Sequence, residues 1–271
     1  MQNKKLQNTV DNNFRQVSDN WPVFGIARDL GSVRSSAVST LFTIGYTQEK
    51  AIQFLGKGSA PQEVPSLWTS YLSEEQCLPF FHRDYKNSAL LSDRIDNRVA
   101  RDSLAAAGQD YLTITSLTVR QTFGALAFTG TDANPTIFLK EISSNSDIQT
   151  VDVIFPAHPL FLYFNPNLVK MVLAPLLENQ ESGHYPRTSA IHDLGRFPRA
   201  LGYPDGNDEP MPLEECGNMV IMMMAYMQRT GDEQYIRDHW DILVKWTQYL
   251  MDDSKIPAEQ LSTDDFAGHL V

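Results

Sequence analysis

The sequence predicts an α+β chain, with a β-rich first part over residues 1–80 and a helical second part over residues 81–271. Short runs of β-branched and aromatic residues, separated by turn-forming residues, are typical of the first part. From about Phe81 onwards, apolar residues recur at helical spacing. Near the end of the chain two such helices are joined by a very short turn, which requires them to lie antiparallel.

Three segments of the first part favour β-strands, namely residues 21–27, 38–46 and 67–72. Each is a short run of β-branched and aromatic residues, and Asp29-Leu30-Gly31-Ser32 supplies a turn after the first. A few strands in this space make a poor sheet by themselves. We therefore expect them to be the last strands of a β-sandwich-like domain whose beginning lies upstream.

Two helices are predicted next, over residues 84–107 and 111–128. In the first, residues at one face repeat every four positions, at Leu91, Ile95, Val99 and Ser103. Gly108 follows it, as is common after a helix. The second is ambiguous because Thr113-Ile114-Thr115 favours a strand. Its length and its lack of an interior proline favour a buried helix that stops at Gly130, so the two would form an αα-hairpin.

The middle of the chain mixes several patterns. Residues 136–142 and 148–155 favour a β-hairpin around a serine-rich turn. Asn167 begins a helix in which Pro175 bends or ends the first segment. Residues 182–212 are rich in Gly, Pro, His and Asp. A loop of that length inside a compact domain is often functional.

The last two helices have the clearest signals. Pro212 falls in the first turn of one, and Glu214 and Glu215 lie beside the positive end of its dipole. Its apolar stripe consists of Cys216, Met219, Val220, Met223 and Met227. Gly231 ends this helix, and Asp232 can cap a second helix that runs to about residue 253.

The composition excludes several classes of protein. A formal net charge of −11 and a pI near 4.9 argue against a nucleic-acid binder, because neutralising phosphate needs clustered Lys and Arg. No apolar stretch approaches the roughly 20 residues of a membrane-spanning helix, and the polar N-terminus lacks a secretory signal pattern. Cys77 and Cys216 have no metal-ligand spacing, and no cofactor fingerprint occurs. We therefore expect neither a metal nor a cofactor.

Ordered motifs extend over residues 14–268. In the first part they are Trp21-Pro22-Val23, Asp29-Leu30-Gly31-Ser32-Val33 and Leu67-Trp68-Thr69-Ser70-Tyr71. In the second part they include Gly108-Gln109-Asp110-Tyr111, Phe138-Leu139-Lys140-Glu141, Glu178-Asn179-Gln180-Glu181-Ser182-Gly183-His184-Tyr185-Pro186, Ile191-His192-Asp193-Leu194-Gly195, Met211-Pro212-Leu213-Glu214-Glu215-Cys216 and Ser262-Thr263-Asp264-Asp265-Phe266. Together these motifs resemble the fungal glutaminase A family.

The resemblance implies a β-sandwich-like domain followed by an (α/α)6 toroid of six helical hairpins. It also implies an extracellular enzyme that hydrolyses L-glutamine to L-glutamate and ammonia. The chain ends shortly after Gly268, where relatives continue, and holds roughly three of the six hairpins that a closed toroid needs. We therefore expect an incomplete toroid in a truncated chain, with self-association possible through its open helical wall.

Hydrolysis of a side-chain amide needs an activated water or nucleophile, a proton donor for ammonia and stabilisation of the oxyanion. Paired carboxylates can act as base and acid. The long loop offers Asp193 as a catalytic residue, with His184, Tyr185 and His192 as substrate-binding residues. The alternative is that Asp193 only caps a turn through its own backbone.

The helix that begins at Pro212 offers a second candidate. Glu215 lies in its first turn as a catalytic carboxylate, and Asn218 lies one turn further along the same side as a substrate-binding amide. The helix dipole should lower the pKa of Glu215 and favour a role as base. The alternative is simple charge complementarity at the helix end.

Three further carboxylates are candidate catalytic residues. Asp264 and Asp265 are adjacent and fall in a family-like motif, although such a pair is often a helix cap or a solvated turn. Glu141 lies on an otherwise apolar strand face, where a carboxylate must be paired or functional. An ion pair with Arg120 is the favoured interpretation of Glu141.

Three functions fit these patterns. The first is a glutaminase-like amidohydrolase, for which the small-molecule substrate is glutamine. The second is a glycoside hydrolase on the same toroid, because two carboxylates at a barrel mouth also suit inverting sugar hydrolysis. The third is a non-catalytic fragment that associates with another chain.

Overall fold

The computed structural model describes residues 9, 11–141 and 145–256. They belong to two units, Met1–Gly45 and Tyr46–Val271, which we describe separately. The described residues of the first unit form no helix and no strand, and apolar side chains such as Trp21 and Phe24 are exposed. The predicted strands at 21–27 and 38–46 are therefore wrong. Neither segment is hydrogen-bonded to a neighbouring strand, and a lone extended segment has nothing to hold it as a strand.

A small sheet opens the second unit. Strand β1 (Lys50–Phe54) pairs antiparallel with β2 (Gln62–Pro65) and parallel with the short β5 (Arg199–Ala200). The predicted strand at 67–72 is wrong, because η1 (Leu67–Ser70) is a 3-10 helix. Both the backbone N–H and the hydroxyl of Thr69 donate to Ser66 O, which turns the chain.

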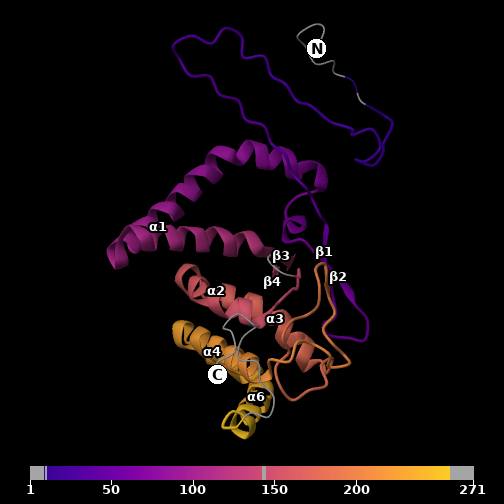
Figure 1. The fold of residues 1–271 in the computed structure, drawn as a ribbon, viewed down its shortest axis with the longest axis vertical. Helices are drawn as coiled ribbons and strands as arrows, with labels where there is room; N and C mark the ends of the chain where they lie inside the picture. The colour runs from indigo at the N-terminus through magenta and orange to yellow at the C-terminus, as the bar shows by residue number, and fades with distance from the viewer. Residues whose placement is uncertain (1–8, 10, 142–144, 257–271) are drawn as a thin grey trace, which may run out of the picture. The chain divides into compact units, whose positions relative to one another are not determined.

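The longest helical element, α1 (Glu74–Ala125), consists of two arms that meet at a kink (Figure 1). Gly108 lies at the kink with a φ of 82°, which glycine adopts without a steric penalty. The hydroxyls of Ser103 and Thr115 are 2.8 Å apart across the bend. The predicted pair of helices separated at Gly108 is confirmed, although the first begins earlier, at Glu74, and the second ends earlier, at Ala125. The prediction that the second helix is buried is wrong, because its apolar residues Tyr111, Ile114 and Leu117 are exposed.

The β-hairpin lies before its predicted place. It consists of β3 (Leu126–Thr131) and β4 (Asn134–Leu139), with Leu126 opposite Leu139. The predicted second strand at 148–155 is wrong, because most of it belongs to helix α2 (Val151–Phe164). The buried residues of α2 recur at helical spacing, at Val151, Ile154, Ala157 and Phe161. Burial on one helical face outweighed the β propensity of the segment.

The remaining helices follow the predicted pattern closely. Helix α3 (Asn167–Glu181) continues through Pro175. Helix α4 (Pro212–Thr230) ends at Gly231, whose φ is 74°. Asp232 then accepts a hydrogen bond from Tyr235 N and caps α5 (Glu233–Asp238). A break at His239 separates α5 from α6 (Trp240–Asp253), which were predicted as one helix.

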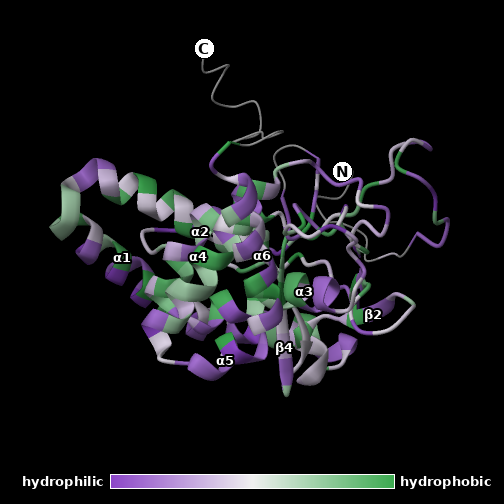
Figure 2. Cartoon of the chain, turned by 90° about the horizontal axis from the view of Figure 1, so that it is seen from below, coloured by the Kyte–Doolittle hydropathy of each residue, from purple (hydrophilic) through white to green (hydrophobic). Residues whose placement is uncertain are grey.

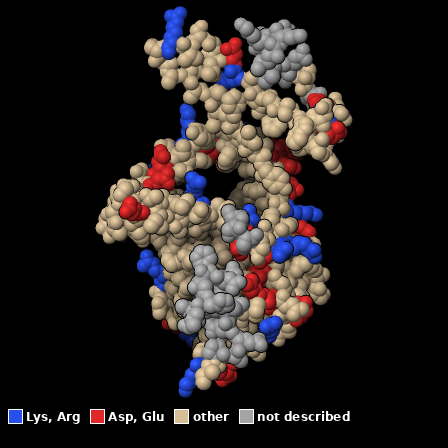
Figure 3. Space-filling model, viewed as in Figure 1, with Lys and Arg blue, Asp and Glu red and all other residues tan. Residues whose placement is uncertain are grey.

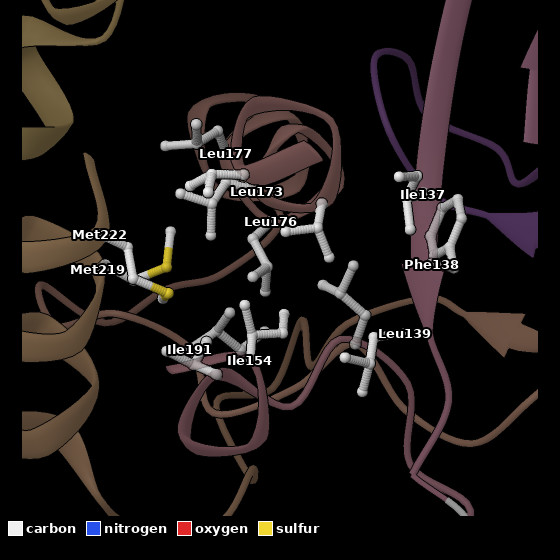
Figure 4. Close-up of a cluster of buried hydrophobic side chains, with 14 of the residues drawn as sticks. Ile137, Phe138, Leu139, Ile154, Leu173, Leu176, Leu177, Ile191, Met219 and Met222 are labelled. Atoms are coloured by element: carbon white, nitrogen blue, oxygen red, sulfur yellow. The ribbon is translucent and has the colours of Figure 1, made fainter. Parts of the chain in front are cut away.

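The hydrophobic core lies between β4 and helices α2, α3 and α4. Figure 4 shows leucines of α3 between Phe138 of β4 on one side and Met219 and Met222 of α4 on the other. In Figure 2, α3 carries hydrophobic residues whereas α5 is mostly hydrophilic. The described residues form a mixed α+β structure, and none of their helices is long and apolar enough to cross a membrane.

Candidate active site

Backbone pairing brings the long loop between α3 and α4 against the start of α2. Ile148 exchanges two hydrogen bonds with the loop, donating to Gly195 O at 2.8 Å and accepting from Leu194 N at 2.9 Å. Val151 N donates to His192 O at 2.8 Å. His192 and Asp193 are therefore fixed beside the first turn of α2, which carries Asp152.

Asp193 is buried and accepts several hydrogen bonds. Oδ2 lies 2.8 Å from His192 Nδ1, while Oδ1 accepts from Gly195 N at 2.5 Å and from the Tyr203 hydroxyl at 2.9 Å. The hydrogen bond from Gly195 N is the backbone turn cap that is the alternative role of Asp193. Asp193 thus caps its own turn and also holds the imidazole of His192.

A second buried carboxylate supports the same loop. Asp208 accepts a hydrogen bond from His192 N at 3.0 Å, and both its oxygens lie 2.9 Å from the Tyr185 hydroxyl. Burial raises the pKa of Asp208, although these hydrogen bonds oppose the shift. Tyr185 therefore contributes to the position of His192 through Asp208.

The first turns of α2 and α4 meet at His192. Nε2 of His192 lies 3.7 Å from Asp152 Oδ1 and 4.0 Å from Glu209 Oε2. Ligand atoms of Asp152, His192 and Glu215 all lie within 4.8 Å of one another. Figure 3 shows a group of adjoining acidic side chains near the middle of the view. One imidazole is thus surrounded by carboxylates.

Glu215 has no exposed surface. Its Oε2 lies 3.4 Å from Asn218 Nδ2, and its Oε1 accepts no hydrogen bond from the described residues. Burial raises the pKa of Glu215 to about 9, and the charge of Asp152 adds to the effect. The prediction that the helix dipole lowers this pKa is wrong, because loss of hydration outweighs the dipole at a fully buried position.

Burial acts on the pKa of the His192 imidazole in the opposite direction, but the net shift is again upward. Burial lowers the pKa of His192, but the hydrogen bond with Asp193 and the nearby carboxylate charges outweigh it. The result is a pKa of about 9. The pKa of His192 and the pKa of Glu215 are therefore both raised above their ordinary values.

The structure brings together only some of the predicted site residues. Asp193, His192, Glu215 and Asn218 form one cluster, with Tyr185 attached through Asp208. His184 instead pairs its Nε2 with Gly56 O at 2.9 Å, in the loop after β1.

The other predicted carboxylates have separate positions. Glu141 accepts a hydrogen bond from the Thr150 hydroxyl at 3.4 Å. Asp264 and Asp265 lie outside the described residues.

Sequence reasoning missed Asp152, Tyr203, Asp208 and Glu209. Asp152 was overlooked because its segment was predicted to be a strand, which would not place a carboxylate at a helix N-terminus. A usable signal was the helical spacing of apolar residues after Val151. Asp208 and Glu209 lie within residues 182–212, the long loop whose length is often a sign of function.

Two family models match this chain. A domain of unknown function matches residues 1–102, and the glutaminase A six helical-hairpin domain matches residues 108–271. Glutaminase A from Aspergillus oryzae is 58% identical over 270 residues, covering 99% of this chain and 39% of that protein. A probable glutaminase from Arthroderma benhamiae is 36% identical over 331 residues, covering 98% and 38%. The chain thus spans about two fifths of the length of these curated relatives.

Proposed function

Because this chain belongs to the glutaminase A family, we propose that it carries the reaction site of a hydrolase that converts L-glutamine to L-glutamate and ammonia. The observation that carries the proposal is the buried grouping of Asp152, His192 and Glu215. Three groups able to exchange protons meet there, and two of them come from adjacent helix ends.

The chemistry of amide hydrolysis suits such a grouping. One group must take a proton from the attacking water and another must protonate the departing ammonia. Glu215 and Asp152 are the carboxylates that flank His192, and His192 and Asn218 can donate hydrogen bonds to a bound carbonyl or carboxylate. Asp193 acts as a positioning residue, because it holds Nδ1 of His192 and so directs Nε2 toward Asp152.

The remaining predicted site residues are secondary candidates for the proposed site. Asp264 and Asp265 stay candidates through their family-like motif. Glu141 precedes helix α2 in the chain. Its negative charge is one of the charges that raise the pKa of Asp147, and it can add to the negative charge near the start of α2. His184 is a candidate only for a more distant part of a substrate, because it contacts the loop after β1.

The wider architecture is part of the same proposal. Helices α2 and α4 begin side by side, as their first-turn carboxylates show, and each is followed by further helix, α3 or α5–α6. Such hairpins with neighbouring first helices are the units of an (α/α)6 toroid. From these hairpins we assign residues 81–271 to the first part of a six-hairpin toroid. From family membership alone we propose that residues 1–80 are the C-terminal part of an N-terminal β-sandwich-like domain and that the protein is extracellular.

The test is release of ammonia from L-glutamine by the purified 271-residue chain, followed by coupled oxidation of NADH. The proposal predicts ammonia in proportion to glutamate, and no release of nitrophenol from aryl glycosides. A folded chain that produces no ammonia would refute the proposal. A self-associated species in size-exclusion chromatography, together with no turnover, would favour the non-catalytic fragment.

An inverting glycoside hydrolase fits the geometry less well. Inverting glycosidases keep their two carboxyl groups roughly 6.5–9.5 Å apart to leave room for a water. Carboxylate oxygens of Asp152 and Glu215 lie within 4.8 Å of each other. This spacing is shorter than the inverting range and close to the roughly 5–5.5 Å of retaining glycosidases. Family membership therefore carries the choice of an amide substrate.

A further inference from the structure

Three side chains that are far apart in the sequence form a compact set of possible metal ligands. They are Asp152 on α2, His192 in the long loop and Glu215 on α4, and their ligand atoms lie within 4.8 Å of one another. His192 Nε2 and Asp152 Oδ1 are 3.7 Å apart. Two ligand atoms on a tetrahedral Zn²⁺, with bonds of about 2.1 Å, would be about 3.4 Å apart. The ligand atoms, which now lie 4.8 Å apart or less, would therefore have to approach one another by at most about 1.4 Å.

A buried carboxylate oxygen that accepts no hydrogen bond from the described residues is a second, independent indication of a cation site. Glu215 is fully buried, and Asn218 holds only its Oε2. Its Oε1 accepts no hydrogen bond from the described residues, and none of their lysines or arginines pairs with it. A buried carboxylate oxygen is costly unless a donor or a cation satisfies it.

The imidazole is held as a metal ligand usually is. His192 Nδ1 is hydrogen-bonded to Asp193, which in turn accepts from the Tyr203 hydroxyl. Histidine ligands typically donate their second ring N–H to a carboxylate, which fixes the ring and strengthens the other nitrogen as a ligand. Nε2 is the nitrogen that faces Asp152 and Glu209.

We propose that Asp152, His192 and Glu215 bind one divalent transition-metal cation. One imidazole and two carboxylates are a ligand set that Zn²⁺ and Mn²⁺ both accept. Glu209, whose Oε2 lies 4.0 Å from His192 Nε2 and whose side chain is 37% exposed, is placed to be a further ligand on the solvent side. A cation there would polarise a bound carbonyl or water. The site lies within the proposed active site, but the binding itself does not depend on which reaction occurs.

The test is equilibrium dialysis of the 271-residue chain against Zn²⁺ and, separately, Mn²⁺, with metal counted by mass spectrometry. We expect one cation per chain. Affinity should fall at least 10-fold in Glu215→Gln and His192→Asn, and about 10- to 100-fold in Asp193→Asn. His239→Gln is the matched control, because His239 also pairs with a carboxylate, Glu181, at 2.7 Å, and it should bind as the parent does.

Glu215→Gln keeps nearly the same shape, so it remains informative if the His192 variant does not fold. Circular dichroism establishes folding, and the visible absorption of bound Co²⁺ reports ligand changes directly. A folded parent that takes up no stoichiometric cation would overturn the proposal, as would unchanged affinity in Glu215→Gln. Ammonia release by a metal-free chain would leave the proposed reaction standing while removing the cation, so the two failures are distinguishable.

Discussion

Nδ1 of His192 lies 2.8 Å from Oδ2 of Asp193, and both side chains are buried. The second oxygen of Asp193 is occupied by Gly195 N and the Tyr203 hydroxyl. The carboxylate therefore cannot turn away without losing three hydrogen bonds. This arrangement fixes the orientation of the imidazole, on which the proposed chemistry depends.

Asp193→Asn should reduce kcat for glutamine by about 100-fold or more. An amide NH2 group facing Nδ1 of His192 donates a hydrogen bond where the carboxylate accepted one, so the imidazole proton moves from Nδ1 to Nε2. KM should change much less, since Asp193 is a positioning residue. Steady-state ammonia release at several glutamine concentrations separates the two constants. Tyr203→Phe is the milder comparison, because Gly195 N still holds Asp193, and it should lose less than 10-fold. Equal activity in folded Asp193→Asn and parent would contradict the positioning role.

Glu215→Gln should make the metal-free chain relatively more stable as the pH rises. Folded Glu215 keeps its proton up to about pH 9, whereas the ordinary pKa of a glutamate is 4.5. The folded state binds more protons between these values, so the stability of the parent falls as the pH rises through this window. Glutamine removes that dependence. Thermal unfolding in a chelating buffer should show a Tm difference that grows from pH 5 to pH 8, and a constant difference would be evidence against the raised pKa.

Much of the helical part was predictable because its signals are local. Pro212, Gly231 and Asp232 mark the ends of α4 and the start of α5 by their backbone and capping chemistry. Gly108 likewise marks the kink of α1. Such signals depend on neighbouring residues, which a single sequence contains.

The strands and the cluster depend instead on distant partners. Residues 21–27 have strand-like composition but no strand beside them, and β1 pairs with Arg199–Ala200, nearly 150 residues away. Asp152, His192 and Glu215 belong to three separate segments, so no spacing motif could reveal them together. The raised pKa of Glu215 was unpredictable for a related reason, since burial is set by the whole fold.

Two glycines near α4 should respond oppositely to the same substitution. Gly231→Ala should lower the free energy of unfolding by about 1–2 kcal/mol, because a φ of 74° is strained for any residue with a Cβ atom. Gly217→Ala lies inside α4 with open space around the added Cβ, and should raise stability by up to about 1 kcal/mol. Urea denaturation at pH 7 checks both signs. The same sign for both would contradict the assigned backbone conformations.

Gln149→Leu should destabilise the chain by at least about 2 kcal/mol. The buried amide accepts a hydrogen bond from Leu139 N at 2.5 Å and donates to Val172 O at 2.6 Å, which links β4 to α3. Leucine leaves the buried Leu139 N without its acceptor, at a cost of about 1–3 kcal/mol, and it also removes the bond that Gln149 donates to Val172 O. Gln248→Leu on the exposed face of α6 is the control, and should change stability by less than about 0.5 kcal/mol. Urea denaturation of the three chains gives the comparison.

Replacing Glu215 with glutamine decides whether the buried cluster around His192 is the reaction site. The measurement is ammonia release from L-glutamine at pH 7 by Glu215→Gln, beside the parent and Asp241→Asn, whose carboxylate lies exposed in the first turn of α6. We predict a loss of about 100-fold or more in Glu215→Gln, with parental activity in Asp241→Asn. A folded Glu215→Gln chain that retains more than about a tenth of the parental rate would place the reaction elsewhere.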